Sequence, residues 1–124
     1  MPGGADVLVV EDDAQINELV GAYVQIAGFE YRAALDGATA LAAVRERLPA
    51  LIILDLMLPD TDGFEIARQL KGDEKTALVP ILMLTALDRD EQRKRGLDAG
   101  AVKYMTKPFD PDALLMKARD VLGL

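Results

Sequence analysis

Short apolar runs of strand length alternate along this chain with segments that carry apolar residues at helical spacing. A strand that is apolar at nearly every position belongs to a parallel sheet that is covered on both faces. Such strands are predicted at residues 7–10, 31–34, 51–54, 81–84 and 102–105. The pattern therefore predicts an α/β fold, with a five-stranded parallel sheet and helices on both faces. The first, third and fourth strands, which are almost wholly aliphatic, should be the central ones.

The predicted helices are marked by capping residues at their ends. Asp13 and Asp62 stand where a side chain would accept hydrogen bonds from the first turn of a helix, and Gly28 stands where the first helix should stop. The last helix is predicted over residues 111–122. The first helix should face the core with apolar residues three and four positions apart, namely Ile16, Leu19, Val20, Tyr23 and Val24.

The length of 124 residues fits one domain, which we expect to span residues 5–124 after a flexible N-terminus of residues 1–4. No apolar run reaches the roughly 18 residues of a membrane span, and the start shows no secretory leader. We therefore expect a cytoplasmic protein that does not contact the membrane.

Several kinds of chemistry are excluded by composition. The chain has no cysteine and no histidine, which removes thiol nucleophiles, disulfides, Ser-His triads and His-based zinc sites. Its net charge of −7 would repel a phosphate backbone, so direct contact with nucleic acid is not expected. Only carboxylate, hydroxyl and amine groups remain for chemistry.

These groups follow the predicted strands, and parallel strands end at one common edge, where ligands bind in open α/β sheets. The residues concerned are Glu11, Asp12, Asp13, Asp55, Thr85 and Lys107. Crowded acids are costly unless a cation lies among them, and oxygen ligands favour Mg²⁺ or Mn²⁺. Beside such an ion and the Lys107 ammonium, Asp55 could attack phosphorus while the Thr85 hydroxyl contacts the phosphoryl oxygens.

Taken singly, most of these residues have simpler interpretations. Acids at a helix start are favoured by the helix dipole, a threonine is common in strands, and a lysine is usually solvated. Asp55 is the exception, because it directly follows a buried strand where an uncompensated charge is expensive. Four separate strand ends supply residues of matching chemistry, and this agreement favours a functional site over the simpler interpretations.

The same residues stand in short motifs, at residues 9–13, 53–59, 62–63, 84–86 and 107–109. Together these motifs resemble the receiver domains of two-component response regulators, of the chemotaxis-regulator type, over nearly the whole chain. The resemblance implies a flavodoxin-like fold with strand order 2-1-3-4-5. It also implies a protein that is not an enzyme on external substrates and catalyses only its own phosphorylation and dephosphorylation.

The resemblance also implies a ligand set for Mg²⁺, with Mn²⁺ as the alternative ion. Asp12 and Asp55 would bind the metal directly, and Glu11 would reach it through water. The backbone carbonyl of Met57 would be a further ligand. Asp55 would in addition be the phosphoacceptor.

Three further roles follow from the resemblance. Thr85 and Lys107 would contact the phosphoryl group, and Tyr104 would be the aromatic residue that turns inward when Thr85 moves. The peptide bond between Lys107 and Pro108 would be cis. Phosphorylation would thereby change the surface formed by the fourth helix, fifth strand and fifth helix.

The implied partners are a sensor histidine kinase or a histidine phosphotransfer protein as donor, and a downstream protein target or effector domain. The donor histidine must come from another protein, because this chain has none. The chain would act as a monomer or as a phosphorylation-dependent dimer. Met57 and Leu87, both apolar, flank the expected approach of water and predict slow loss of the phosphoryl group.

Three alternatives remain. A phosphatase of the haloacid dehalogenase type also uses an aspartate after a buried strand, but its general acid would fall on Met57, which cannot donate a proton. A flavodoxin-like electron carrier would need a phosphate cradle where this chain has an acidic loop. A phosphorylation-independent binding module of the same fold would not need the acids, Thr85 and Lys107 that are all present here.

Overall fold

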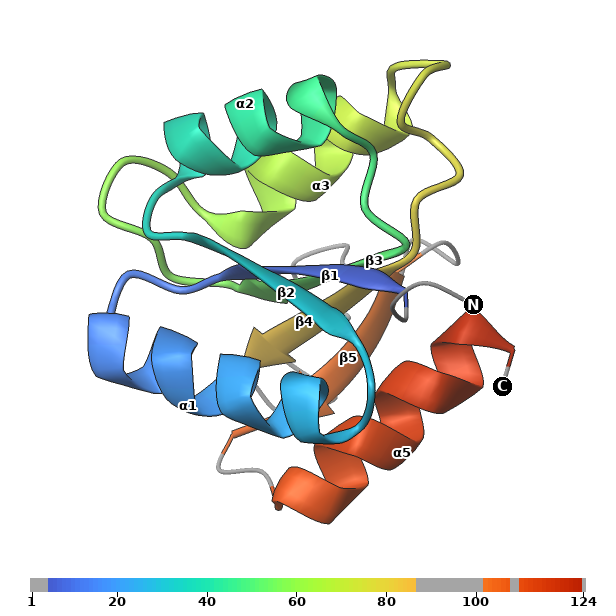
Figure 1. The fold of residues 1–124 in the computed structure, drawn as a ribbon. Coiled ribbons are helices and arrows are strands. Elements are labelled where there is room, and N and C mark those ends of the chain that lie inside the picture. Colours follow the sequence, from blue (N-terminus) through green and yellow to red (C-terminus); the bar gives the residue numbers. More distant parts are fainter. Residues whose placement is uncertain (1–4, 87–101, 108–109, 124) are drawn as a thin grey trace.

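A computed structural model describes residues 5–86, 102–107 and 110–123. Its five strands form one parallel sheet in the order β2-β1-β3-β4-β5, which confirms the predicted topology (Figure 1). Each predicted strand lies within one residue of the observed bounds at either end. The strands are β1 (Asp6–Val10), β2 (Glu30–Ala34), β3 (Leu51–Asp55), β4 (Ile81–Thr85) and β5 (Val102–Thr106).

Four helices are described, with α1 and α5 on one face of the sheet and α2 and α3 on the other (Figure 1). Their bounds are α1 (Ala14–Ile26), α2 (Gly37–Glu46), α3 (Gly63–Lys71) and α5 (Pro111–Leu122). Both faces are therefore covered, as predicted. None of these described helices has the length and apolar character needed to cross a membrane. The expected fourth helix and the expected flexible N-terminus lie outside the described residues.

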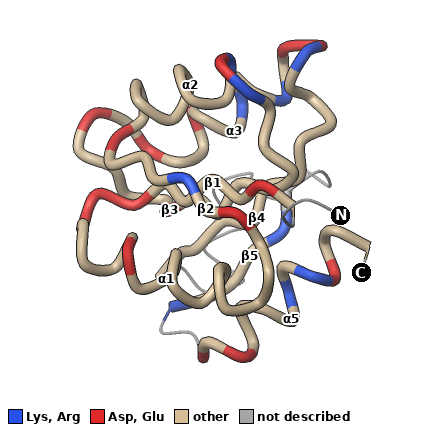
Figure 2. The backbone as a smooth tube through the Cα atoms, viewed as in Figure 1, with Lys and Arg blue, Asp and Glu red and all other residues tan. Residues whose placement is uncertain are grey.

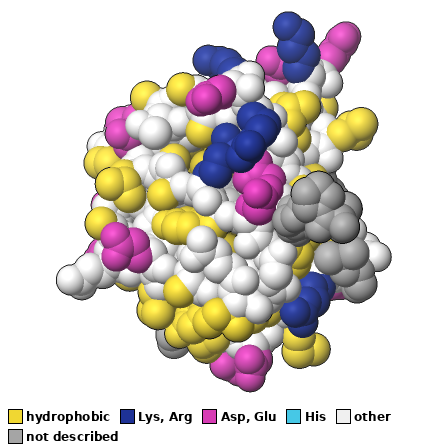
Figure 3. Space-filling view, viewed as in Figure 1, with side chains coloured by type: hydrophobic (Ala, Val, Ile, Leu, Met, Phe, Trp, Pro, Cys, Tyr) yellow, Lys and Arg dark blue, Asp and Glu magenta, His cyan; other side chains and the backbone are white. Residues whose placement is uncertain are grey.

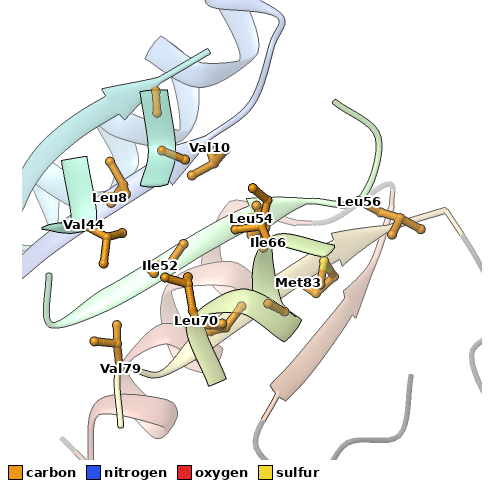
Figure 4. Close-up of a cluster of buried hydrophobic side chains, with 14 residues drawn as sticks. Leu8, Val10, Val44, Ile52, Leu54, Leu56, Ile66, Leu70, Val79 and Met83 are labelled. Atoms are coloured by element: carbon orange, nitrogen blue, oxygen red, sulfur yellow. The ribbon is translucent and has the colours of Figure 1, made fainter. Parts of the chain in front are cut away.

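The central strand β3 is buried at every position and divides the core into two clusters. Successive side chains of a strand point to opposite faces of the sheet. Ile52 and Leu54 accordingly pack toward α2 and α3, in the cluster of which Figure 4 shows a part. Leu51 and Ile53 pack toward α1 and α5. The end of β3 is thus held rigidly from both sides.

The buried face of α1 differs from the predicted one. Val20 and Val24 are buried as predicted, but Ile16 and Leu19 are 38% and 52% exposed, so the prediction that they face the core was wrong. The buried positions are shared instead with Asn17 and Gly21. The rotation has a physical reason, because the Asn17 amide is fully engaged in buried hydrogen bonds and Gly21 lies against a side chain of β2.

Each described helix begins at an aspartate whose side chain accepts hydrogen bonds from backbone N–H groups of the first turn. The predicted caps Asp13 and Asp62 are confirmed, and Asp36 and Asp110 are two more. Gly28 follows the end of α1 with a positive φ of 94°, which favours glycine at that position.

Candidate functional site

The chain leaves β1 and β3 at the same edge of the sheet, and this edge carries an acidic cluster. Carboxylate oxygens of Glu11, Asp12 and Asp55 all lie within 4.8 Å of one another. Glu11 and Asp55 are only 4% and 6% exposed, whereas Asp12 is exposed to solvent. Figure 2 shows acidic residues along the loops at the left of the molecule, where the chain leaves these strands. The structure therefore brings together the three acids that the sequence placed after separate strands.

Lys107 lies against this cluster. Its Nζ atom is 3.1 Å from Oδ1 of Asp55 and 3.6 Å from Oε1 of Glu11. Its backbone N–H donates to the carbonyl oxygen of Thr85 at 2.8 Å, which fixes the start of the segment after β5 against the end of β4. Within the part of the chain that the structure describes, the Lys107 ammonium group is the positive charge that contacts the acidic cluster.

Thr85 is the last residue of β4 and is buried. The neighbouring strand β3 remains paired with β4 up to this point, since the N–H of Leu56 donates to the carbonyl oxygen of Leu84 at 3.0 Å. Tyr104 lies in β5 in register with Met83, and it is partly buried against the core cluster under α2 and α3. It therefore lies two positions before the end of its strand rather than at the edge itself.

The loop after β3 is tightly held. The N–H of Met57 donates to Oδ1 of Asp55 at 3.3 Å, while the Met57 side chain is 73% exposed and points away from the core. The N–H of Leu58 donates to the carbonyl oxygen of Thr61 at 3.2 Å, and the N–H of Gly63 donates to that of Leu56 at 2.7 Å. The backbone at residue 57 is thus constrained on both sides.

Burial and crowding change the protonation of the site. Burial raises the pKa of Glu11 from 4.5 to about 7, and hydrogen bonds with Asp55 and Asp12 act in the same direction. The charge of Asp55 raises this pKa further, whereas the charge of Lys107 opposes the shift. One ammonium group therefore leaves the cluster short of positive charge. Three converging carboxylates with an excess of negative charge fit a hard divalent cation such as Mg²⁺.

Two polar residues that hold loops at this edge of the sheet were not predicted. Asn17 donates from its side chain to three backbone carbonyls around the acidic loop, and Asp60 accepts from the N–H groups of Gly37 and Ala38 at 2.8 and 3.0 Å. These two hydrogen bonds hold the pKa of Asp60 below its usual value. A polar residue among apolar ones on α1 was a signal for Asn17, but nothing local in the sequence indicates the contact of Asp60 with α2.

Two further acids lie close together in the chain, Asp60 and Asp62, and they do not form another catalytic site. The carboxylate of Asp60 caps α2, and that of Asp62 accepts from the N–H of Glu65 at 2.9 Å and caps α3. Both side chains are thus explained by helix capping. The general acid of a phosphatase of the haloacid dehalogenase type would stand two residues after Asp55, where this chain has Met57, which cannot donate a proton. The capping roles of Asp60 and Asp62 do not supply this acid from the neighbouring loop.

A fold of this topology with acids and a lysine at its edge defines a receiver-like signalling domain, and comparison with known proteins agrees. The family model described as the response regulator receiver domain matches residues 7–119. The chain belongs to this family. It is a phospho-accepting receiver domain of a two-component system rather than an enzyme on external substrates, and receiver domains partner with histidine kinases.

Similar proteins include regulators from several bacteria. The chain is 43% identical over 119 residues to the phosphate regulon transcriptional regulatory protein PhoB of Pseudomonas aeruginosa, covering 96% of this chain and 52% of that protein. It is 42% identical over 116 residues to the DNA-binding dual master transcriptional regulator RpaA of Synechocystis, covering 94% and 48%. The chain therefore spans about half the length of these curated relatives.

Solved structures agree on the fold. The chemotaxis response regulator CheY4 of Vibrio cholerae matches with a TM-score of 0.86 at 35% identity, covering 94% of this chain and 98% of that one. The receiver domain of a signal transduction histidine kinase from Syntrophus aciditrophicus matches with a TM-score of 0.89 at 28% identity, covering 97% and 91%.

Proposed function

We propose that Asp55 is the phosphoacceptor of this domain, with Mg²⁺ held beside it. The observation that carries this proposal is the buried Asp55 carboxylate, which lies among two other acids and 3.1 Å from the Lys107 ammonium. Asp12 and Asp55 would bind the metal directly, with the Met57 carbonyl as a further ligand and Glu11 acting through water. The bound ion would neutralise charge on the phosphoryl oxygens.

The contacts of Asp55 favour its role over that of its acidic neighbours. Its Oδ1 atom accepts from the N–H of Met57 and pairs with Lys107, so the carboxylate is oriented at the end of a rigid strand. Asp12 is exposed to solvent, whereas Asp55 is buried. A carboxylate oxygen of Asp55 would attack phosphorus as the bond from phosphorus to the donor breaks, and Lys107 and Thr85 would contact the phosphoryl oxygens.

The donor would be a histidine kinase or a phosphotransfer protein. The chain contains no histidine, so the phosphohistidine must lie on a partner that docks at the acidic edge. The exposed apolar residues Ile16, Leu19 and Ile26 lie on α1, which begins directly after the acidic loop. Hydrophobic side chains gather over this helix in Figure 3. They would provide contact area for the donor without entering the site.

The output would be a change in surface shape. Thr85 would move toward the phosphoryl oxygens, and Tyr104 would turn into the space it leaves. Because Tyr104 belongs to β5, the surface that includes β5 and α5 would change and would select a downstream target, an effector domain or a second copy of the chain.

Acetyl phosphate, a small phosphodonor, tests this proposal without a kinase. The wild type, Asp55→Asn and the control Asp13→Asn are incubated with acetyl phosphate and Mg²⁺, and intact mass is measured. Asp13 is a matched control because it adjoins the site but caps α1, a role that asparagine also fills. We expect one phosphoryl group on the wild type and on Asp13→Asn, and none on Asp55→Asn.

Other outcomes would overturn the proposal in distinct ways. An adduct that persists in Asp55→Asn would assign the phosphoacceptor to another residue. No adduct on any variant would favour a binding module that works without phosphorylation. Continued release of inorganic phosphate from excess donor, far beyond one turnover per chain, would favour a phosphatase.

A further inference from the structure

Asn17 joins the first helix to the acidic loop through its buried side chain. Its Nδ2 atom lies 3.1 Å from each of three backbone carbonyl oxygens, those of Val9, Glu11 and Ala34. The N–H of Glu11 in turn donates to the carbonyl oxygen of Ala34 at 3.1 Å. The peptide groups on both sides of Glu11 are thus held, one by Asn17 and one by the end of β2.

Tyr31 of β2 completes this network from the other side. Its hydroxyl group donates to the side-chain oxygen Oδ1 of Asn17, and it lies 3.2 Å from the backbone carbonyl oxygen of the same residue. The tyrosine ring reaches Asn17 by crossing α1 at Gly21, one helical turn later. A Cβ atom on residue 21 would lie 2.4 Å from ring atoms of Tyr31, so only glycine leaves room for the ring.

The hydroxyl group of Tyr31 satisfies the oxygen of the Asn17 amide. An amide has one accepting oxygen and one donating nitrogen, and only the nitrogen can serve the three carbonyls. The oxygen therefore needs a donor on its other side, and Tyr31 is the donor that the structure places there. Without it, a buried acceptor is left unsatisfied, which weakens the hold of the amide on the three carbonyls.

We propose that Tyr31 is a positioning residue for the metal site: its hydroxyl group, through Asn17, fixes the backbone that presents Glu11 and Asp12 to Asp55. This inference rests on the proposed function, because it concerns the same acids. It adds a residue on β2 that lies outside the acidic cluster. The set Tyr31, Asn17 and Gly21 acts as one unit, in which the glycine makes room, the tyrosine donates and the asparagine holds the loop.

The test removes one oxygen atom. Tyr31→Phe keeps the ring and loses the hydroxyl group, and Tyr23→Phe is the matched control, because Tyr23 lies on α1 within one turn of Gly21. Binding of Mn²⁺ is measured by the electron paramagnetic resonance signal of the free ion. Backbone amide shifts of Glu11 and Asp12 are measured by NMR in metal-free protein.

We expect Tyr31→Phe to weaken Mn²⁺ binding roughly three- to tenfold and to shift the amides of Glu11 and Asp12, with Tyr23→Phe like the wild type. A positioning role also predicts rescue, since phosphorylation of Tyr31→Phe by acetyl phosphate should be slow at low Mg²⁺ and regain the wild-type rate at saturating Mg²⁺. Because bound Mg²⁺ also stabilises a weakened fold, the amide shifts of Glu11 and Asp12 in metal-free protein separate a positioning role from a general loss of stability.

Unchanged Mn²⁺ affinity together with unchanged Glu11 and Asp12 amide shifts in Tyr31→Phe would overturn the inference. So would wild-type Mn²⁺ affinity in Asn17→Ser, a second variant whose shorter side chain cannot reach all three carbonyls. A wild type that binds no metal and takes no phosphoryl group would instead defeat the proposed function, while the metal-free amide shifts would still decide whether Tyr31 holds the loop.

Discussion

The Nζ atom of Lys107 lies 3.1 Å from Oδ1 of Asp55, and this single ammonium group also faces the buried Glu11 at 3.6 Å. One cation cannot neutralise two buried carboxylates and the nearby Asp12 together. Burial raises the pKa of Glu11, and the neighbouring acids raise it further. The remaining negative charge is the reason why a divalent cation would stabilise the site. The same shortage of positive charge makes Lys107 important for the transfer of a dianionic phosphoryl group.

Removal of this ammonium group should slow phosphorylation strongly. We expect Lys107→Met to lower the initial rate with acetyl phosphate by roughly 10- to 100-fold, because a preorganised charge on the phosphoryl oxygens is lost. The rate is measured by intact mass over time. Lys103→Met is the matched control, since Lys103 is an exposed lysine of β5, the strand that Lys107 directly follows. Equal rates in Lys107→Met and the wild type would show that the ammonium group does not act on the phosphoryl group.

The raised pKa of Glu11 predicts an unusual pH dependence in metal-free protein. The Glu11 carboxyl group keeps its proton up to about pH 7 in the folded state, whereas in the unfolded state it releases this proton near pH 4.5. The folded state therefore binds more protons between these values, and the free energy of unfolding should fall as pH rises from about 4.5 to about 7. The decrease has an upper limit of about 3 kcal/mol for such a shift.

Urea unfolding in EDTA at both ends of this pH window measures the effect. Glu11→Gln, which cannot ionise, is the control and should lose this part of the pH dependence. Mg²⁺ should reverse the trend, because metal ligands must be deprotonated to bind. A difference in stability between Glu11→Gln and the wild type that stays constant across the window would contradict the assignment to Glu11.

Gly63 brings α3 close to the phosphoacceptor strand. A Cβ atom at this position would lie 2.7 Å from the carbonyl oxygen of Asp55 and 2.8 Å from the sulfur of Met83. We expect Gly63→Ala to lower the free energy of unfolding by roughly 1–3 kcal/mol and to weaken Mg²⁺ binding, because the backbone after β3 must shift. Chemical denaturation and metal titration are the measurements.

Gly72→Ala provides the comparison for this substitution. Gly72 follows α3 with a φ of −82°, and its nearest neighbour would be 3.2 Å from the new Cβ atom. A smaller loss of stability and unchanged metal binding are expected there. If both alanine variants behave alike, the close approach at Gly63 does not shape the site.

The strands and their common edge could be predicted because the signals are local. A run such as residues 51–54 is buried on both faces wherever it sits in a parallel sheet, and residues that follow such runs must share an edge. The positions of Glu11 and Asp55 followed from this rule alone. The chemistry of these residues suggested a divalent cation and attack on phosphorus by Asp55, whereas the individual ligand roles came from the resemblance to a family. All of these roles remain proposals.

The buried face of α1 could not be predicted from its apolar pattern. Ile16 and Leu19 continue the helical spacing of Val20, yet they are exposed, because Asn17 and Gly21 occupy the inner face through contacts with β2. Hydrophobic spacing cannot reveal a hydrogen bond between residues far apart in the chain. The contact between Asp60 and α2 escaped prediction for the same reason.

The side chain of Met57 predicts a long-lived phosphoryl group. It is 73% exposed at the edge of the site, and its N–H donates to Asp55, so it stands beside the expected path of the hydrolytic water. A thioether is only a weak acceptor and cannot orient that water, whereas an amide can donate and accept. We expect Met57→Asn to lose its phosphoryl group several-fold faster, measured by intact mass after acetyl phosphate is removed in the presence of Mg²⁺. Met116→Asn, at an exposed methionine of α5, is the control and should lose its phosphoryl group at the wild-type rate. If Met57→Asn loses the phosphoryl group no faster than this control, the access of water is limited elsewhere.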